Sequence, residues 1–151
     1  MLRSILFLFS LFTLTFSQLA LADQSLTLQT EKVFTYPSIK DGNGAIYGTF
    51  VNKGNSDVNI ISATSPAVKT VELHTMSMEN NMMRMRAVPF YTVPAKGRLT
   101  LQSGAEHIML IGLVNPIKAG DSFPVTLKLD NGNTQTITVN AIARGSNLNV
   151  H

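Results

Sequence analysis

The chain has 151 residues, no cysteine, 12 basic and 9 acidic residues, and a formal net charge of +3. So small an excess gives no indication of the clustered basic face of a nucleic-acid-binding protein, and we expect no nucleic-acid partner. Without cysteine there is no disulfide and no thiolate that could bind a metal or act as a nucleophile. Any soft metal ligand must therefore be one of the seven methionines.

The N-terminal residues have the pattern of an export signal peptide over residues 1–22. Arg3 supplies the positive charge, residues 4–16 read SILFLFSLFTLTF, and ALA at 20–22 is a small-residue cleavage site. The apolar segment is shorter than the roughly 20 residues that span a bilayer, and no cysteine follows it for a lipid anchor. We predict cleavage after Ala22, export to the periplasm and no stable membrane insertion. Loss of Arg3 lowers the 12 basic residues to 11 against 9 acidic ones, a formal charge of +2.

The remaining sequence is a series of short segments rich in Val, Ile, Thr and aromatic residues, separated by Gly, Asn, Pro and Asp. The predicted strands are residues 25–36, 45–52, 57–65, 68–78, 82–88, 97–102, 107–113, 123–129 and 134–142. Many short strands at this spacing predict an all-β antiparallel sandwich or barrel. We expect one monomeric domain over residues 23–144, followed by a short disordered tail over 145–151.

Five of the seven methionines lie within residues 74–85, which read HTMSMENNMMRM. Side chains alternate along a strand, so the residues of segment 68–78 divide between two faces. Val71 and Leu73 suit a core, and the opposite face carries Glu72, His74, Met76 and Met78. The strand therefore has one apolar face, and its opposite face carries a histidine and two methionines after Glu72.

A two-residue turn at Asn80 and Asn81 would fold this segment into a hairpin, because Asn enters left-handed conformations at low cost. His74 would then lie diagonal to Met85 on the same face. The turn also predicts two cross-strand pairs, Met78 with Met83 and Met76 with Met85. The opposite face of the hairpin is expected to carry Met82 and Arg84.

A second soft pair lies in segment 107–113, where His107 and Met109 are two residues apart and share a face. Imidazoles and thioethers without a carboxylate favour Cu(I) over Zn, Mg or Ca, because neutral polarisable sulfur stabilises a soft monovalent ion. The alternative is that the methionines only pack, as methionine commonly does. In that case the protein is a structural β-sandwich without a metal.

At these residues the sequence resembles the periplasmic copper chaperones of the PCuAC family. The family signature is His, ten residues, Met, twenty-one residues, His, one residue and Met, which His74, Met85, His107 and Met109 match without a gap. The similarity extends over residues 45–129. The resemblance implies a cupredoxin-like β-sandwich that binds one Cu(I) ion through these four residues at an exposed site.

The resemblance also implies partners. In the family, copper is delivered toward the dinuclear copper centre of cytochrome c oxidase, so we expect a copper-accepting oxidase subunit and a thiol-containing partner chaperone. A periplasmic scavenging or tolerance protein without an oxidase client is the alternative. We expect no enzymatic activity, because no nucleophile motif is present. A blue-copper electron carrier would need a cysteine ligand.

Four further residues border the expected site. Met76 and Met78 share the ligand face, and we hypothesise that they shield the ion and offer transient ligands during transfer. The alternative is that they form a hydrophobic collar. Glu72 and Glu106 lie close to the histidines in sequence and could accept hydrogen bonds that orient the two imidazoles.

Overall fold

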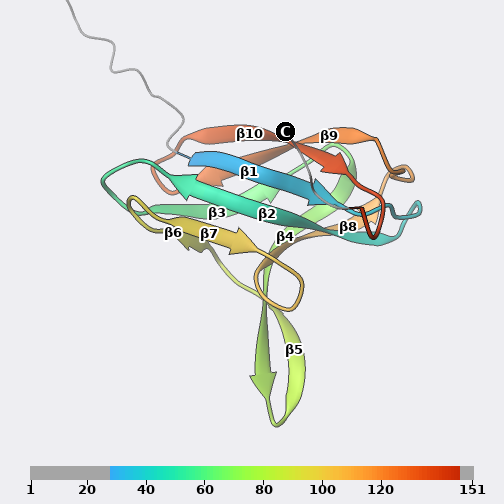
Figure 1. The fold of residues 1–151 in the computed structure, drawn as a ribbon, viewed down its shortest axis with the longest axis horizontal. Helices are drawn as coiled ribbons and strands as arrows, with labels where there is room; N and C mark the ends of the chain where they lie inside the picture. The colour runs from blue at the N-terminus through green and yellow to red at the C-terminus, as the bar shows by residue number, and fades with distance from the viewer. Residues whose placement is uncertain (1–27, 147–151) are drawn as a thin grey trace, which may run out of the picture.

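A computed structural model describes residues 28–146, which form ten β-strands and no helix (Figure 1). The strands are β1 (Leu28–Thr35), β2 (Asn43–Asn52), β3 (Val58–Thr64), β4 (Val68–Glu79), β5 (Met82–Ala87), β6 (Tyr91–Val93), β7 (Arg98–Leu101), β8 (His107–Leu113), β9 (Ser122–Leu129) and β10 (Thr134–Ala141). The described range includes no helix with the length and hydrophobicity needed to cross a membrane. The predicted signal peptide and most of the predicted tail lie outside the described residues.

The all-β prediction is confirmed, and nine of the ten strands coincide with predicted segments. Strand β6 was missed. It has three residues and lies between Pro89 and Pro94. A segment this short, bracketed by residues that cannot donate a backbone hydrogen bond, is not recognisable from alternation alone.

The strands form one continuous sheet in the order β5-β4-β8-β2-β1-β10-β9-β3-β6, with β7 also paired to β2. The sheet folds back on itself, so that β3 packs on β4 while β6 packs on β2 and β7 (Figure 1). The described pairs are antiparallel except that of β1 with β10, which is parallel. This pair departs from the expected arrangement, and it can be parallel because β1 and β10 are not joined by a hairpin.

Alternate residues of the strands fill the space between the two halves of the sheet. In β8, Ile108 and Leu110 have no exposed surface, so the alternate residues His107 and Met109 belong to the opposite face. The other fully buried large side chains include Phe50, Ile46, Ile60, Val125, Leu127 and Val139. The apolar side of β8 therefore fixes which side of the sheet carries its histidine and methionine.

Strands β4 and β5 leave the body of the sandwich as a projecting hairpin (Figure 1). The register of β4 with β8 ends at His74, and beyond that residue β4 pairs with β5. The hairpin turns at Asn80 and Asn81, whose φ angles are 49° and 60°. This left-handed pair confirms the predicted two-residue turn and with it the predicted register of the methionines.

Candidate metal centre

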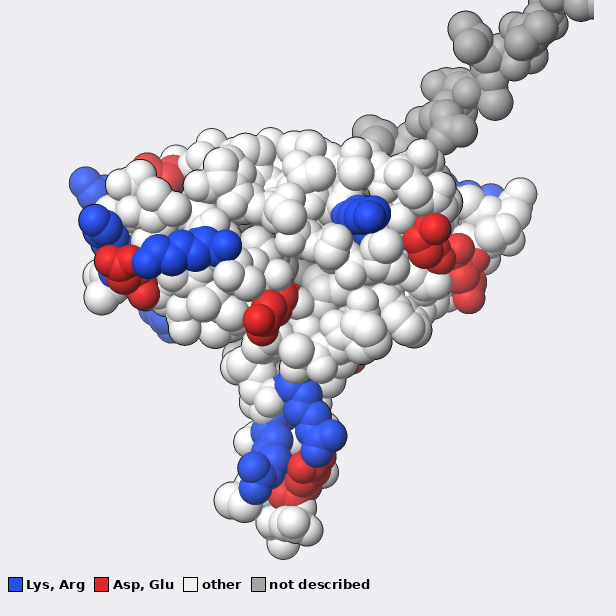
Figure 2. All heavy atoms as spheres, turned by 180° about the vertical axis from the view of Figure 1, so that it is seen from behind, with Lys and Arg blue, Asp and Glu red and all other residues white. Residues whose placement is uncertain are grey.

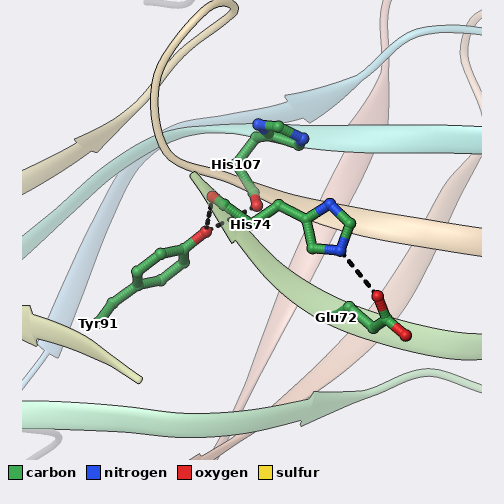
Figure 3. A network of polar contacts seen from close by, with 4 residues as sticks. All are labelled: Glu72, His74, Tyr91 and His107. Carbon is green, nitrogen blue, oxygen red and sulfur yellow. Dashed lines mark hydrogen bonds and ion pairs between the residues drawn. The ribbon is translucent and has the colours of Figure 1, made fainter. Parts of the chain in front are cut away.

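The two predicted histidines face each other across β4 and β8. His74 lies directly opposite His107 in the register, and their ring centroids are 5.7 Å apart (Figure 3). A ligating imidazole nitrogen lies about 2.0–2.1 Å from a metal, so two rings on one ion have centroids roughly 5–6.5 Å apart. The observed separation therefore fits two imidazoles that share one ion.

Hydrogen bonds determine which nitrogen of each neutral ring is free. Nε2 of His74 donates to a carboxylate oxygen of Glu72 at 2.7 Å, which leaves the lone pair on Nδ1. Nδ1 of His107 donates to the carbonyl oxygen of Ala105 at 3.0 Å, which leaves the lone pair on Nε2. Both rings thus have one nitrogen anchored and one available as a ligand, as in metal sites whose histidines are held by a hydrogen-bond acceptor.

The available nitrogen of His74, Nδ1, is buried and has no hydrogen-bond partner among the described residues. An unpartnered buried polar atom costs free energy in the metal-free protein, and nearly all such atoms in native structures are satisfied. A metal ion coordinated by this nitrogen would satisfy it.

The two carboxylates predicted to orient the histidines behave differently. Glu72 contacts the ring of His74, as expected. Glu106 instead accepts a hydrogen bond from the hydroxyl of Thr75 at 3.4 Å, and Ala105 supplies the acceptor for His107. The expectation that Glu106 orients His107 was wrong, because neighbouring residues of an extended chain point in opposite directions.

Thioethers lie beside the histidine pair. Met85, His107 and Met109 line one groove of about 320 Å³, together with Met76. Met85 lies directly opposite Met76 in the hairpin, as predicted. Three of the four residues of the sequence signature therefore line this groove, and the fourth, His74, adjoins it through its ring contact with His107.

The donor groups of the groove suit a soft cation. No carboxylate belongs to the described residues that line it, and its one cationic lining residue is Arg144, whose guanidinium lies 5.0 Å from the centre of the Tyr36 ring. Residues 28–146 contain no group of three or more His, Cys, Asp or Glu side chains that could hold a metal. The donors gathered here are imidazole and thioether groups, which favour Cu(I) over hard divalent ions.

Tyr91 holds the two histidine-bearing strands together. Its hydroxyl lies 2.5 Å from the carbonyl oxygen of His74 and 2.7 Å from that of His107 (Figure 3). Burial is the main cause that raises the pKa of Tyr91 to about 12, and the charge of Glu106 adds to it. No sequence pattern identifies this residue, because it is one tyrosine in a three-residue strand.

The opposite face of the hairpin is polar. Glu79 forms ion pairs with Arg84, at 3.7 Å, and with Arg86. Figure 2 shows basic side chains running along the projecting hairpin with acidic ones beside them. Met82 lies opposite Glu79 in the register and therefore shares this face, as predicted. The hairpin thus separates its methionine-lined face from its charged face.

Comparisons with known proteins agree with this architecture. The solution structure of CuI-DR1885 from Deinococcus radiodurans is 28% identical, with a TM-score of 0.62 over 84% of this chain and 87% of that chain. A copper-bound PCuAC domain from PmoF2 has a TM-score of 0.64 at 17% identity, over 78% of this chain and 93% of that chain. The resemblance to PCuAC domains drawn from the sequence is confirmed by these folds.

The sequence relatives lead to a named family. The "Putative lipoprotein Lxx21020" of Leifsonia xyli subsp. xyli (strain CTCB07) is 34% identical over 99 residues, which are 65% of this chain. The chain spans 60% of the length of that relative. The family model described as "Putative lipoprotein LpqE-like" matches residues 26–141. The chain therefore belongs to the LpqE-like family, and its fold is that of the PCuAC domain.

Proposed function

We propose that this protein binds one Cu(I) ion through His74, Met85, His107 and Met109, and that it is a carrier of the ion and not an enzyme. The observation that carries the proposal is the opposed histidine pair, in which each ring has one nitrogen anchored and one available. The solution structure of the Cu(I) form of DR1885 supports the same ion.

The position of the site favours transfer over storage. One ligand, Met85, belongs to the projecting hairpin and is 48% exposed, whereas His107 is anchored in the body and 4% exposed. An incoming thiolate could replace the exposed thioether first, while the histidines retain the ion until more bonds to the acceptor have formed. Ligand exchange of this kind leaves copper as Cu(I) and never releases the free ion. The driving force is the stronger ligand set of the acceptor.

The proposed acceptor is the copper-binding subunit of cytochrome c oxidase, with a thiol-containing chaperone as an intermediate partner. Transfer to such a protein requires that the chain be exported, which the pattern of residues 1–22 and the lipoprotein descriptions of its relatives support. We therefore place its action in the periplasm. The client and the compartment are both parts of the proposal.

Titration with Cu(I) under reducing conditions, against a strong competing chelator, tests the binding step. The wild type is expected to take one equivalent from the chelator, and a His74→Ala, Met109→Leu variant is expected to take none. Met82→Leu is the matched control, since this methionine lies on the charged face of the hairpin. Equal binding by all three proteins, or binding by none, would overturn the proposed site.

A second experiment tests the carrier role. The copper-loaded protein is mixed with the metal-free soluble copper domain of an oxidase subunit, and the metal content of each is measured after separation. We expect copper to move to the oxidase domain. Retention of copper by a protein that binds it normally would contradict delivery and would indicate a scavenging role.

A further inference from the structure

We propose that the outer part of the β4–β5 hairpin forms a second, weaker site for a soft monovalent cation, built from the thioethers of Met76, Met78 and Met83. The four-residue site described above lies at the base of the hairpin, and this second site lies toward its tip. Its role as an entry point for copper rests on the proposed function. Its capacity to bind a soft cation does not.

The register brings the three thioethers together. Met78 lies directly opposite Met83, and Met76 is the next residue of β4 on the same face. Directly opposed residues have Cβ atoms about 4.5–5.5 Å apart, and diagonal neighbours about 7–8 Å apart. Methionine has three rotatable side-chain bonds, so the three sulfur atoms can converge on one ion from these positions.

Packing does not account for these side chains. Met78 is 63% exposed and Met83 is 49% exposed. Figure 1 shows that the hairpin stands clear of the sandwich, with no other described strand beside its outer part. A collar would be expected to bury Met78 and Met83 against the core, whereas here both side chains are exposed to solvent. Met76 is partly buried and lines the inner groove.

The charges on the hairpin favour a soft ion. The carboxylate of its outer part, Glu79, lies on the opposite face and forms ion pairs with Arg84 and Arg86. The methionine face of this segment therefore offers neutral sulfur and no anionic oxygen. Such ligands select Cu(I) or Ag(I) over Mg²⁺, Ca²⁺ or Zn²⁺. Lacking the two imidazoles, this site is expected to be weaker than the inner one.

Met76 connects the two sites. It pairs with Met85 in the hairpin and also lines the groove with His107 and Met109. An ion held by the outer thioethers could exchange Met78 and Met83 for Met85 and a histidine while Met76 stays within reach. The ion remains monovalent throughout, and no bond other than metal–ligand bonds forms or breaks.

Silver(I), a redox-inert probe for soft cation sites, tests the proposal in the full chain expressed with its own N-terminus. Methyl NMR signals of the methionines are followed during titration with silver nitrate. We expect two equivalents to bind, the second of which shifts the methyl signals of Met76, Met78 and Met83 and leaves that of Met82 unchanged. A Met78→Leu, Met83→Leu variant should lose the second equivalent and keep the first. The matched Met82→Leu variant should keep both.

The outcomes separate the two proposals. One equivalent bound by the wild type, with unmoved Met78 and Met83 signals, would overturn the outer site and leave the inner site intact. Loss of the tight equivalent in the His74→Ala, Met109→Leu variant, with the weak one retained, would support both sites. The entry role predicts several-fold slower loading of the inner site from a Cu(I)–chelator complex in the Met78→Leu, Met83→Leu variant. Equal loading rates would overturn that role.

Discussion

Replacing Tyr91 by Phe removes the hydroxyl that bridges the two histidine-bearing strands and keeps the ring that packs in the core. The single hydroxyl proton is shared between the backbone carbonyl oxygens of His74 and His107. Leaving buried acceptors without their donor costs about 1–3 kcal/mol. We therefore expect the unfolding free energy of the metal-free variant to be lower than that of the wild type by about 1–3 kcal/mol at neutral pH.

The same substitution should change the dependence of stability on pH. The pKa of Tyr91 is raised from 10.0 to about 12 in the folded protein. As the pH rises through this range, the tyrosine loses its proton first in the unfolded chain. The stabilisation of the folded protein by protonated Tyr91 is therefore complete below pH 10 and is lost by about pH 12. The full contribution corresponds to about 3 kcal/mol. Because Phe cannot titrate, the advantage of the wild type over the variant should shrink across this range.

Chemical unfolding of both proteins, followed by circular dichroism in metal-free buffer between about pH 8 and pH 11.5, measures this difference across the range where a tyrosine titrates. Tyr36→Phe is the control, since the ring of Tyr36 packs against Phe34 and Arg144 near the surface. Groups that titrate in both proteins cancel in the comparison. Parallel stability profiles for the wild type and Tyr91→Phe would refute the assignment of Tyr91 as a buried, protonated bridge.

Three further substitutions test other parts of the structure. Glu72→Gln should lower Cu(I) affinity by roughly tenfold in chelator competition without changing the stoichiometry, because the anchor of His74 is weakened. Asn81→Val places a β-branched residue at a φ of 60° and costs about 1–2 kcal/mol. Faster amide exchange in β5 but not in β10 is then expected. Gly48→Ala should lower stability by about 1–3 kcal/mol in thermal unfolding, because its φ is 138° and the new Cβ would lie 2.8 Å from the carbonyl oxygen of Lys32. An unchanged melting temperature of the Gly48→Ala variant would contradict this steric argument.

Local patterns predicted much of the fold. Alternation of Val125, Leu127 and Val139 with polar residues identified the β9–β10 hairpin, because a two-residue period is all that a half-buried strand requires. The same period, combined with the Asn80–Asn81 turn, placed the methionines on one face. These features depend on residues close together in the chain, so the sequence contains the information directly.

Contacts between distant segments could not be predicted in the same way. The direct opposition of His74 and His107 depends on the pairing of β4 with β8, which local alternation does not specify. The hydroxyl of Tyr91 reaches both strands only because the sheet folds back on itself. The prediction for Glu106 was wrong for another reason. It assumed that a residue adjacent to His107 could reach the imidazole ring of His107, although adjacent side chains of an extended chain point in opposite directions.

The charged face of the hairpin has a consequence for solubility. Strand β5 ends the sheet, and all six of its residues are exposed. An open edge of this kind can pair with the same edge of a second molecule and begin aggregation. Such pairing would bring the arginines of two copies together, and Arg84 and Arg86 outnumber the one carboxylate that they contact. Like-charge repulsion along this edge should therefore keep separate copies apart while the sulfur-bearing face stays open to solvent.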